Sequence, residues 1–206
     1  MALPTRFDEL ENTELVARFL RSRNGQTALE RARDVMEHCK DFRLLLSEQR
    51  LPDHLLTGKE RDLLRAALEL STRYTLTKAR AEGPLSSPDD VRTYLSMKLS
   101  GLEHEVFGGI LLNNRHQILE CRDFFQGTVD SAACYPREIV KHCLRVNACA
   151  ALFYHNHPSG VAEPSDTDVR LTRKLVDALS LVDIRVLDHV VVGAATMTSL
   201  AERGLM

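Results

Sequence analysis

The chain has 206 residues, a formal net charge of −2 and 44% hydrophobic residues. This is the composition of a globular protein that can bury its own core without disulfides, and the near-neutral charge argues against a general binder of polyanions. No apolar run approaches the roughly 20 residues of a membrane span. The N-terminal residues also lack the layout of a signal peptide, so we expect no membrane partner and a cytoplasmic location.

The cysteines are predicted to be reduced thiols, most of them buried. There are five, an odd number, and no two have the CxxC spacing of a thiolate metal site. They are Cys39, Cys121, Cys134, Cys143 and Cys149.

Helices are expected throughout the first 80 residues, where no strand-like alternation occurs. One helix is predicted to be capped by Asn12 or Thr13 and to run through Phe19, and a second to follow a cap at Thr27 and span 28–40. The third has apolar residues at i, i+4, i+7 and i+11, which predicts one buried stripe. The stripe consists of Leu63, Ala67, Leu70 and Tyr74.

A stretch rich in proline, glycine and serine over 81–90 is the best candidate for a linker. We therefore divide the chain into an all-helical N-terminal domain (1–82), a linker (83–90) and a larger C-terminal domain (91–206). A short helix is expected near 91–99, with Ser87 or Asp89 as its cap.

The C-terminal domain is predicted to be α/β, with strands and helices interleaved. An apolar run over 106–112, a turn at Asn113-Asn114 and a second run over 118–121 indicate a hairpin. Further strands are expected at 148–154 and 184–192, and helices at 136–147 and 165–180. The result is a sheet flanked by helices.

Two histidines follow the buried strand that ends near Tyr154. On a strand His155 and His157 point the same way, about 6–7 Å apart at the backbone, so both imidazoles can reach one cation. Asp168, in the first turn of the next helix, is the expected third ligand. Two imidazoles and a carboxylate, with a fourth position left for water, are typical of a catalytic zinc site, so we expect one Zn²⁺ per chain.

Such a site also needs an acidic residue that moves the proton of the attacking water. Glu105 directly precedes the strand at 106–112 and is the preferred candidate. Glu103, two residues earlier and on the same face, stays an alternative.

The spacing His155-x-His157, seven residues, Ser165, two residues, Asp168, with Glu105 upstream, resembles the JAMM (MPN-plus) metalloprotease motif. The wider matches resemble the bacterial RadC family: His155-Asn-His-Pro-Ser-Gly160, Pro136-Arg137-Glu138-Ile139, and Asp188-His189 before a run of valines. The resemblance implies a JAB/MPN-like sandwich with a mixed sheet. It further implies zinc held by the two histidines and the aspartate, Glu105 as acid–base residue and Ser165 as an oxyanion donor, in an enzyme that hydrolyses a peptide or isopeptide bond.

Several of these residues also have structural interpretations. Ser165 and Asp168 have the spacing of a capping box, and this role can coexist with catalysis at Ser165. Asn156, Asp188 and His189 are expected to orient the ligands rather than bind the metal, because a fourth protein ligand would exclude water. The remaining histidines have no partners at ligand spacing and are predicted to lie on the surface. They are His38, His54, His104, His116 and His142.

The N-terminal region departs from the helix–hairpin–helix module that begins many RadC-like proteins. Where a paired-glycine turn would bind a DNA phosphate, this chain has only Gly58, with Asp53 and Glu60 close by. DNA contact is therefore only weakly supported, and a helical scaffold is expected. A metal-dependent nuclease and a non-enzymatic interaction module are the alternatives to a peptidase; the intact set of ligands argues against the second.

Overall fold

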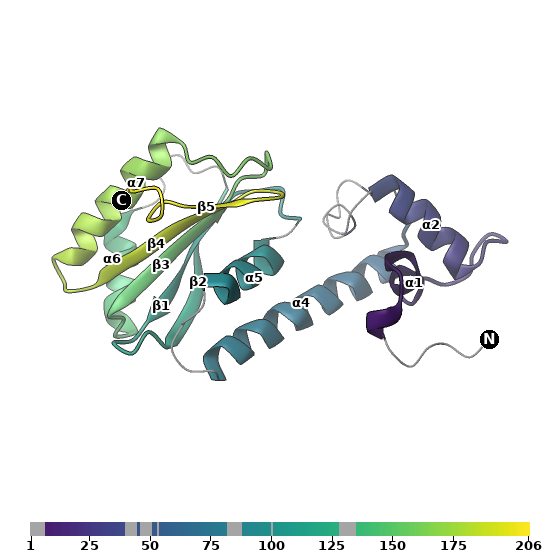
Figure 1. Ribbon diagram of the computed structural model, residues 1–206, viewed down its shortest axis with the longest axis horizontal. Coiled ribbons are helices and arrows are strands. Elements are labelled where there is room, and N and C mark those ends of the chain that lie inside the picture. The colour runs from purple at the N-terminus through teal and green to yellow at the C-terminus, as the bar shows by residue number, and fades with distance from the viewer. Residues whose placement is uncertain are drawn as a thin grey trace. The chain divides into compact units, whose positions relative to one another are not determined.

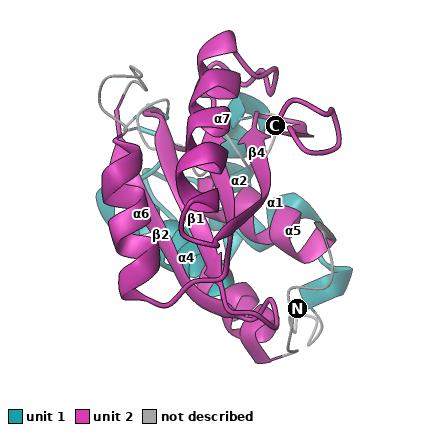
Figure 2. Ribbon diagram, turned by 90° about the vertical axis from the view of Figure 1, so that its left-hand side faces the viewer, with its two compact units in different colours: residues 1–71 teal, residues 72–206 magenta. Residues whose placement is uncertain are grey.

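The computed structural model describes residues 7–39, 45, 51–52, 54–81, 88–99, 101–127 and 135–206. The chain divides into two compact units, residues 1–71 and 72–206, which Figure 2 colours separately. Most of the linker predicted at 83–90 lies outside the described residues, so the domain boundaries placed there stay a prediction. Within the described part of the chain, no helix is long and apolar enough to cross a bilayer.

The first unit is built from helices, as predicted (Figure 1). They are η1 (Phe7–Glu9), α1 (Asn12–Ala17), α2 (Ala28–Cys39) and the first part of α4 (Gly58–Ala81), which continues into the second unit. The predicted cap of α2 is confirmed, because the Thr27 hydroxyl accepts a hydrogen bond from the Glu30 backbone N–H at 3.2 Å. The N-cap of α1 is Glu11 rather than Asn12 or Thr13, and the helix ends before Phe19.

The predicted buried stripe on α4 is wrong. Leu63, Leu70 and Tyr74 are 55%, 68% and 71% exposed. The buried face begins instead with Glu60 and Leu64, which are 5% and 6% exposed. The helix is thus turned by one residue, about 100°, from the orientation that hydrophobicity predicts. The reason is that a charged residue, Glu60, faces the interior.

Glu60 forms an ion pair with Arg31 of α2 inside the first unit. The pair is bidentate: the Nη1–Oε1 and Nη2–Oε2 distances are 2.6 and 3.0 Å. Glu60 also accepts hydrogen bonds from the backbone N–H groups of Arg21 and Thr57, while Arg31 donates to the carbonyls of Arg21 and Leu55. This buried pair therefore joins α2 and the start of α4 to Arg21 before α2 and to Leu55 and Thr57 before α4.

We expect Glu60→Gln to lower the free energy of unfolding at pH 7 by about 3 kcal/mol, because it leaves the buried Arg31 charge without its partner. Burial alone would raise the pKa of Glu60, but hydrogen bonds from Arg31, Thr57 and Arg21 hold this pKa at about 2, below its ordinary value of 4.5. A carboxylate whose pKa is depressed on folding stabilises the fold above the unfolded value and loses that effect as pH falls. The difference between wild type and variant should therefore shrink between pH 4.5 and pH 2.

The free energies of unfolding are measured by urea denaturation, and Glu30→Gln is the matched control. Glu30 makes the same capping bonds with Thr27 that Glu60 makes with Thr57, but it is exposed and faces no buried arginine. Its substitution should have a much smaller effect on stability. Equal effects of the two variants would show that capping, and not the buried ion pair, accounts for the loss.

The second unit contains a mixed five-stranded sheet, which confirms the predicted fold class. The strands are β1 (Val106–Leu112), β2 (Ile118–Gln126), β3 (Ala150–Asn156), β4 (Arg185–Val192) and β5 (Met197–Ser199), in the order β2-β1-β3-β4-β5. Only β3 and β4 pair in parallel. The predicted hairpin is therefore present. β2 extends beyond the predicted Cys121, and the three-residue β5 was not predicted.

Helices cover both faces of this sheet (Figure 1). α5 (Pro88–Leu99) packs on one face, and α6 (Pro136–Arg145) with α7 (Asp166–Ser180) packs on the other. β3 supplies both cores by alternation: Leu152 and Tyr154 face α5, whereas Ala151 and Phe153 face α6 and α7. The next residue that points toward α7 is therefore His155.

One predicted surface histidine is buried. His142 is only 6% exposed, because its Nε2 lies 3.0 Å from a Glu120 oxygen and its Nδ1 lies 2.7 Å from Arg145 Nη2. The other four are exposed or partly exposed. Of the described cysteines, Cys39 and Cys143 are buried, Cys121 is partly buried and Cys149 is exposed, and all four are free thiols.

Candidate metal centre

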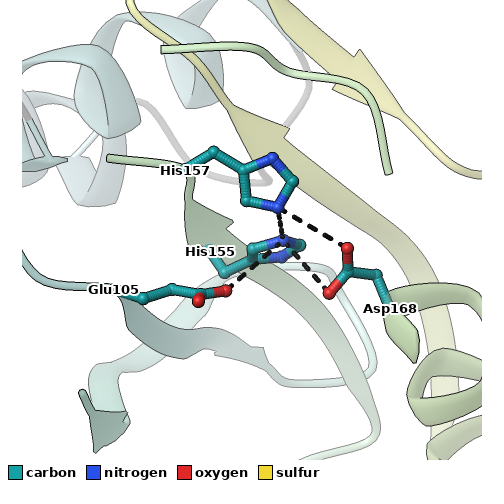
Figure 3. A group of neighbouring side chains, drawn as sticks. All are labelled: Glu105, His155, His157 and Asp168. Carbon is teal, nitrogen blue, oxygen red and sulfur yellow. Dashed lines mark hydrogen bonds and ion pairs between the residues drawn. The ribbon is translucent and has the colours of Figure 1, made fainter. Parts of the chain in front are cut away.

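The two histidines predicted as ligands meet at the end of β3. His155 lies on the strand and His157 just beyond it, and their Nε2 atoms are 2.9 Å apart (Figure 3). His155 is 1% exposed and the His157 side chain 18%, so the pair lies at the edge of the core with one side open to solvent. The two imidazoles therefore converge, as the alternation of side chains along the strand predicted.

Two carboxylates complete the cluster (Figure 3). Asp168, in the first turn of α7, has its two oxygens 3.4 Å from His155 Nε2 and 3.5 Å from His157 Nε2. Glu105, the residue before β1, lies 3.9 Å from His155 Nε2. One ligand atom from each of the four residues lies within 4.8 Å of the others, so the cluster can hold a metal ion.

Asp168 is held as a carboxylate. Burial by itself would raise its pKa, but the hydrogen bond and charge of His155 and the hydrogen bonds of Ser165 outweigh this effect and hold the pKa well below its ordinary value. Ser165 caps α7: its backbone N–H and hydroxyl each donate to Asp168 Oδ2 at 2.7 Å, and its oxygen accepts from the Asp168 N–H at 3.2 Å. The predicted capping box is therefore present, and it aims the carboxylate at the histidines.

A chain of buried hydrogen bonds fixes the tautomer of His155. The Thr172 hydroxyl donates to the Asp168 carbonyl at 2.6 Å, so its oxygen is left to accept from His189 Nδ1–H, also at 2.6 Å. His189 Nε2 must then accept from His155 Nδ1–H, at 2.8 Å. Complete burial, reinforced by the neighbouring His155, lowers the pKa of His189 and keeps it neutral. In neutral His155 the lone pair is therefore on Nε2, which faces the cluster.

His157 is oriented in the same way by the loop that follows it. Its Nδ1 lies 2.7 Å from the Val161 carbonyl, which only accepts, so Nε2 again carries a lone pair. The loop is seated against the end of β4: the Ala194 N–H donates to the Gly160 carbonyl, and a Cβ on Gly193 would lie 2.6 Å from that oxygen. A side chain at Gly193 would therefore displace the loop that orients His157.

Asn156 holds the segment that carries Glu105. Its Oδ1 accepts from the Val106 N–H at 2.8 Å, and its Nδ2 donates to the His104 carbonyl at 3.0 Å. These bonds fix the residues on either side of Glu105, whose own carbonyl accepts from the Gly127 N–H. Of the two glutamates considered from the sequence, Glu105 is the one in the cluster.

The residues around the two histidines and Asp168 are only partly those predicted. Of the predicted pair Asp188 and His189, His189 contacts a ligand, whereas Asp188 accepts from the backbone N–H groups of His189 and Ala201. Sequence reasoning missed Thr172. Its signal was its position, one helical turn after Asp168 on the same face of α7.

With both imidazoles neutral, the Nε2 lone pairs of His155 and His157 converge with the carboxylates of Glu105 and Asp168. A cation or a shared proton among the four groups stabilises such an arrangement. The set of nitrogen and oxygen donors suits a divalent transition metal.

We expect Thr172→Val to weaken metal binding about tenfold, because it releases the tautomer of His189 and hence of His155. Thr198→Val is the matched control, a buried threonine on β5 outside the hydrogen-bond chain. Affinity is measured by competition with a chelating dye, and thermal unfolding of the metal-free protein reports the loss of packing separately. If the two variants bind metal equally well, the hydrogen-bond chain does not set affinity.

Residues 85–205 match the RadC-like JAB domain family, which is related to the JAMM metalloproteases. The chain is 45% identical to a UPF0758 protein of Marinobacter nauticus, over 96% of this chain and 90% of that protein. UPF0758 proteins of Azotobacter vinelandii and Alcanivorax borkumensis are each 44% identical, over 95% of this chain and 89% of theirs. The mixed sheet with its flanking helices agrees with the JAB/MPN-like fold expected from the sequence. The chain thus belongs to the RadC family.

Proposed function

We propose that this protein is a zinc-dependent hydrolase of the JAMM type that cleaves a peptide or isopeptide bond. The observation that carries the proposal is the convergence of His155 Nε2, His157 Nε2 and the Asp168 carboxylate at a partly open edge of the sheet, with Glu105 beside them. Two imidazoles and one carboxylate form an open set of ligands, which is typical of catalytic rather than structural zinc.

His155, His157 and Asp168 would hold the ion. Bound there, zinc would lower the pKa of a water molecule toward about 7 and polarise a substrate carbonyl. Zinc is favoured over harder cations because two of the three ligands are imidazoles.

Glu105 would act as the acid–base residue. Its carboxylate is 17% exposed and adjoins the ligands, so it can accept a proton from the attacking water and pass it to the leaving amine. The bonds of Asn156 on both sides of it restrict its backbone and hence the position of the carboxylate.

Ser165 would stabilise the oxyanion that forms as the carbonyl is attacked. Its hydroxyl lies next to Asp168 at the open side of the cluster, where it donates to the carboxylate. In this role the same hydroxyl would turn from the carboxylate to the substrate oxygen, while its backbone kept the cap of α7 in place.

The purified protein should contain about one zinc per chain by mass spectrometry. His157→Ala should lose the metal because it removes one of three ligands, and it should keep the fold because His157 lies outside the core. His116→Ala, a histidine in the β1–β2 turn, serves as control and should retain the metal. If the protein neither contains zinc nor takes it up from solution, the proposal of a zinc-dependent hydrolase is wrong.

Glu105→Gln should retain zinc and lose hydrolysis by about 10²- to 10⁴-fold, the usual contribution of a positioned acid–base residue. Activity is measured by screening fluorogenic peptide libraries and isopeptide-linked substrates with wild type and then repeating the hits with the variant. Glu103→Gln is the control and should stay active. If Glu105→Gln kept the full activity of the wild type, another residue would be the acid–base residue.

A further inference from the structure

A groove on the helical unit has no part in the proposed catalysis. Its volume is about 630 Å³, and it is formed by the connection from α1 to α2, Arg31 of α2, Thr57 and the first turns of α4. All of its lining residues belong to the first compact unit. Its lining includes Phe19, Arg21, Arg23, Lys59, Leu63 and Ala66.

The walls of the groove are held in place from behind. The buried Arg31–Glu60 pair bonds both backbone groups of Arg21 and so attaches the α1–α2 connection to the start of α4. The connection then turns tightly: Arg23 and Gln26 exchange backbone hydrogen bonds, and Asn24 and Gly25 take positive φ values of 54° and 79°. A groove built on these contacts is formed before any ligand arrives, so little ordering is needed on binding.

The floor of the groove is apolar and accessible. Leu63 is 55% exposed, and Phe19 and Ala66 line the groove beside it. Along the same face of α4 the next large apolar residue, Leu70, is 68% exposed. Leu63 and Leu70 belong to the stripe that sequence periodicity predicted to be buried, and a helical face with that period is suited to bury apolar side chains of another segment.

The rim of the groove is basic. Arg21, Arg23 and Lys59 are exposed, and among the described residues none of their side chains forms an ion pair. Arg31 and Glu60 neutralise each other, which leaves Asp62 as the acidic lining residue against three cations. The groove therefore presents a positive rim around an apolar floor.

We propose that this groove binds an acidic amphipathic peptide segment of a partner protein. Its apolar side chains would cover Leu63 and Ala66, and its carboxylates would lie against Arg21, Arg23 and Lys59. A nucleic acid fits the groove less well, because phosphates would meet Asp62 and would leave the aliphatic floor uncovered. Such a partner would localise the second unit and its proposed activity. Peptide binding by the groove does not require that the proposed hydrolysis occurs.

The test is selection from a display library of random 15-residue peptides on the full-length protein. Counter-selection uses Arg23→Glu/Lys59→Glu, which reverses two rim charges at exposed positions. Enriched peptides should combine Asp or Glu with apolar residues at helical spacing. By fluorescence anisotropy, both the double charge reversal and Leu63→Ser should weaken their binding at least about tenfold.

Arg33→Glu is the control, an exposed charge reversal on α2 outside the groove, and it should leave binding unchanged. Enrichment of peptides without acidic residues, or of peptides that bind the double variant equally well, would overturn the proposal. So would tighter binding of a 20-nucleotide DNA that depends on the same two cations. Self-association of the wild type that Leu63→Ser abolishes, seen by sedimentation, would assign the groove to a second copy of the chain instead.

Discussion

The antiparallel pairing of β1 with β3, in which Phe107 lies opposite His155, is the constraint on which the candidate metal centre depends. This register places the residues just before β1 beside the end of β3, so Glu105 reaches His155 although 50 residues separate them in the chain. A slip of one residue would turn His155 toward α5, away from Asp168. Buried residues along the full length of both strands make such a slip costly, because every apolar side chain would change faces.

The second requirement is that the ligands present lone pairs and not protons. Helix α7 contributes to this requirement in two ways. Its first turn carries Asp168, and Thr172 one turn later begins the hydrogen-bond chain that ends at His155. The N-terminus of a helix also favours negative charge, so the capping bonds from Ser165 and the helix dipole both stabilise the carboxylate. The site is thus arranged by the sheet and the helix together, and not by the loop alone.

Local sequence patterns predicted most of the second unit, because its strands and helices are amphipathic or fully apolar and end at recognisable turns. The alternation at His155 and His157 and the capping-box spacing at Ser165 were enough to predict that His155, His157 and Asp168 lie together. The predicted burial of the α4 stripe was wrong, because periodicity identifies an apolar face without indicating which element covers it. The face that is buried instead carries Glu60, and its partner Arg31 lies in another helix. Thr172 was missed for a similar reason, since its role depends on a contact with β4.

The Arg31–Glu60 pair of the first unit and the histidine–carboxylate cluster of the second unit differ in their hydrogen bonding. In the first unit, Glu60 accepts from Arg31, Arg21 and Thr57, and each acceptor therefore has a donor. The cluster is complete without any ligand. In the second unit, the outer nitrogens of His155 and His157 have partners, and the inner nitrogens converge with the Glu105 and Asp168 carboxylates on one point where a metal ion could sit. A cation or a proton stabilises such an arrangement, and the hydrogen bonds at both Nδ1 atoms leave Nε2 as the metal-binding nitrogen of each neutral imidazole.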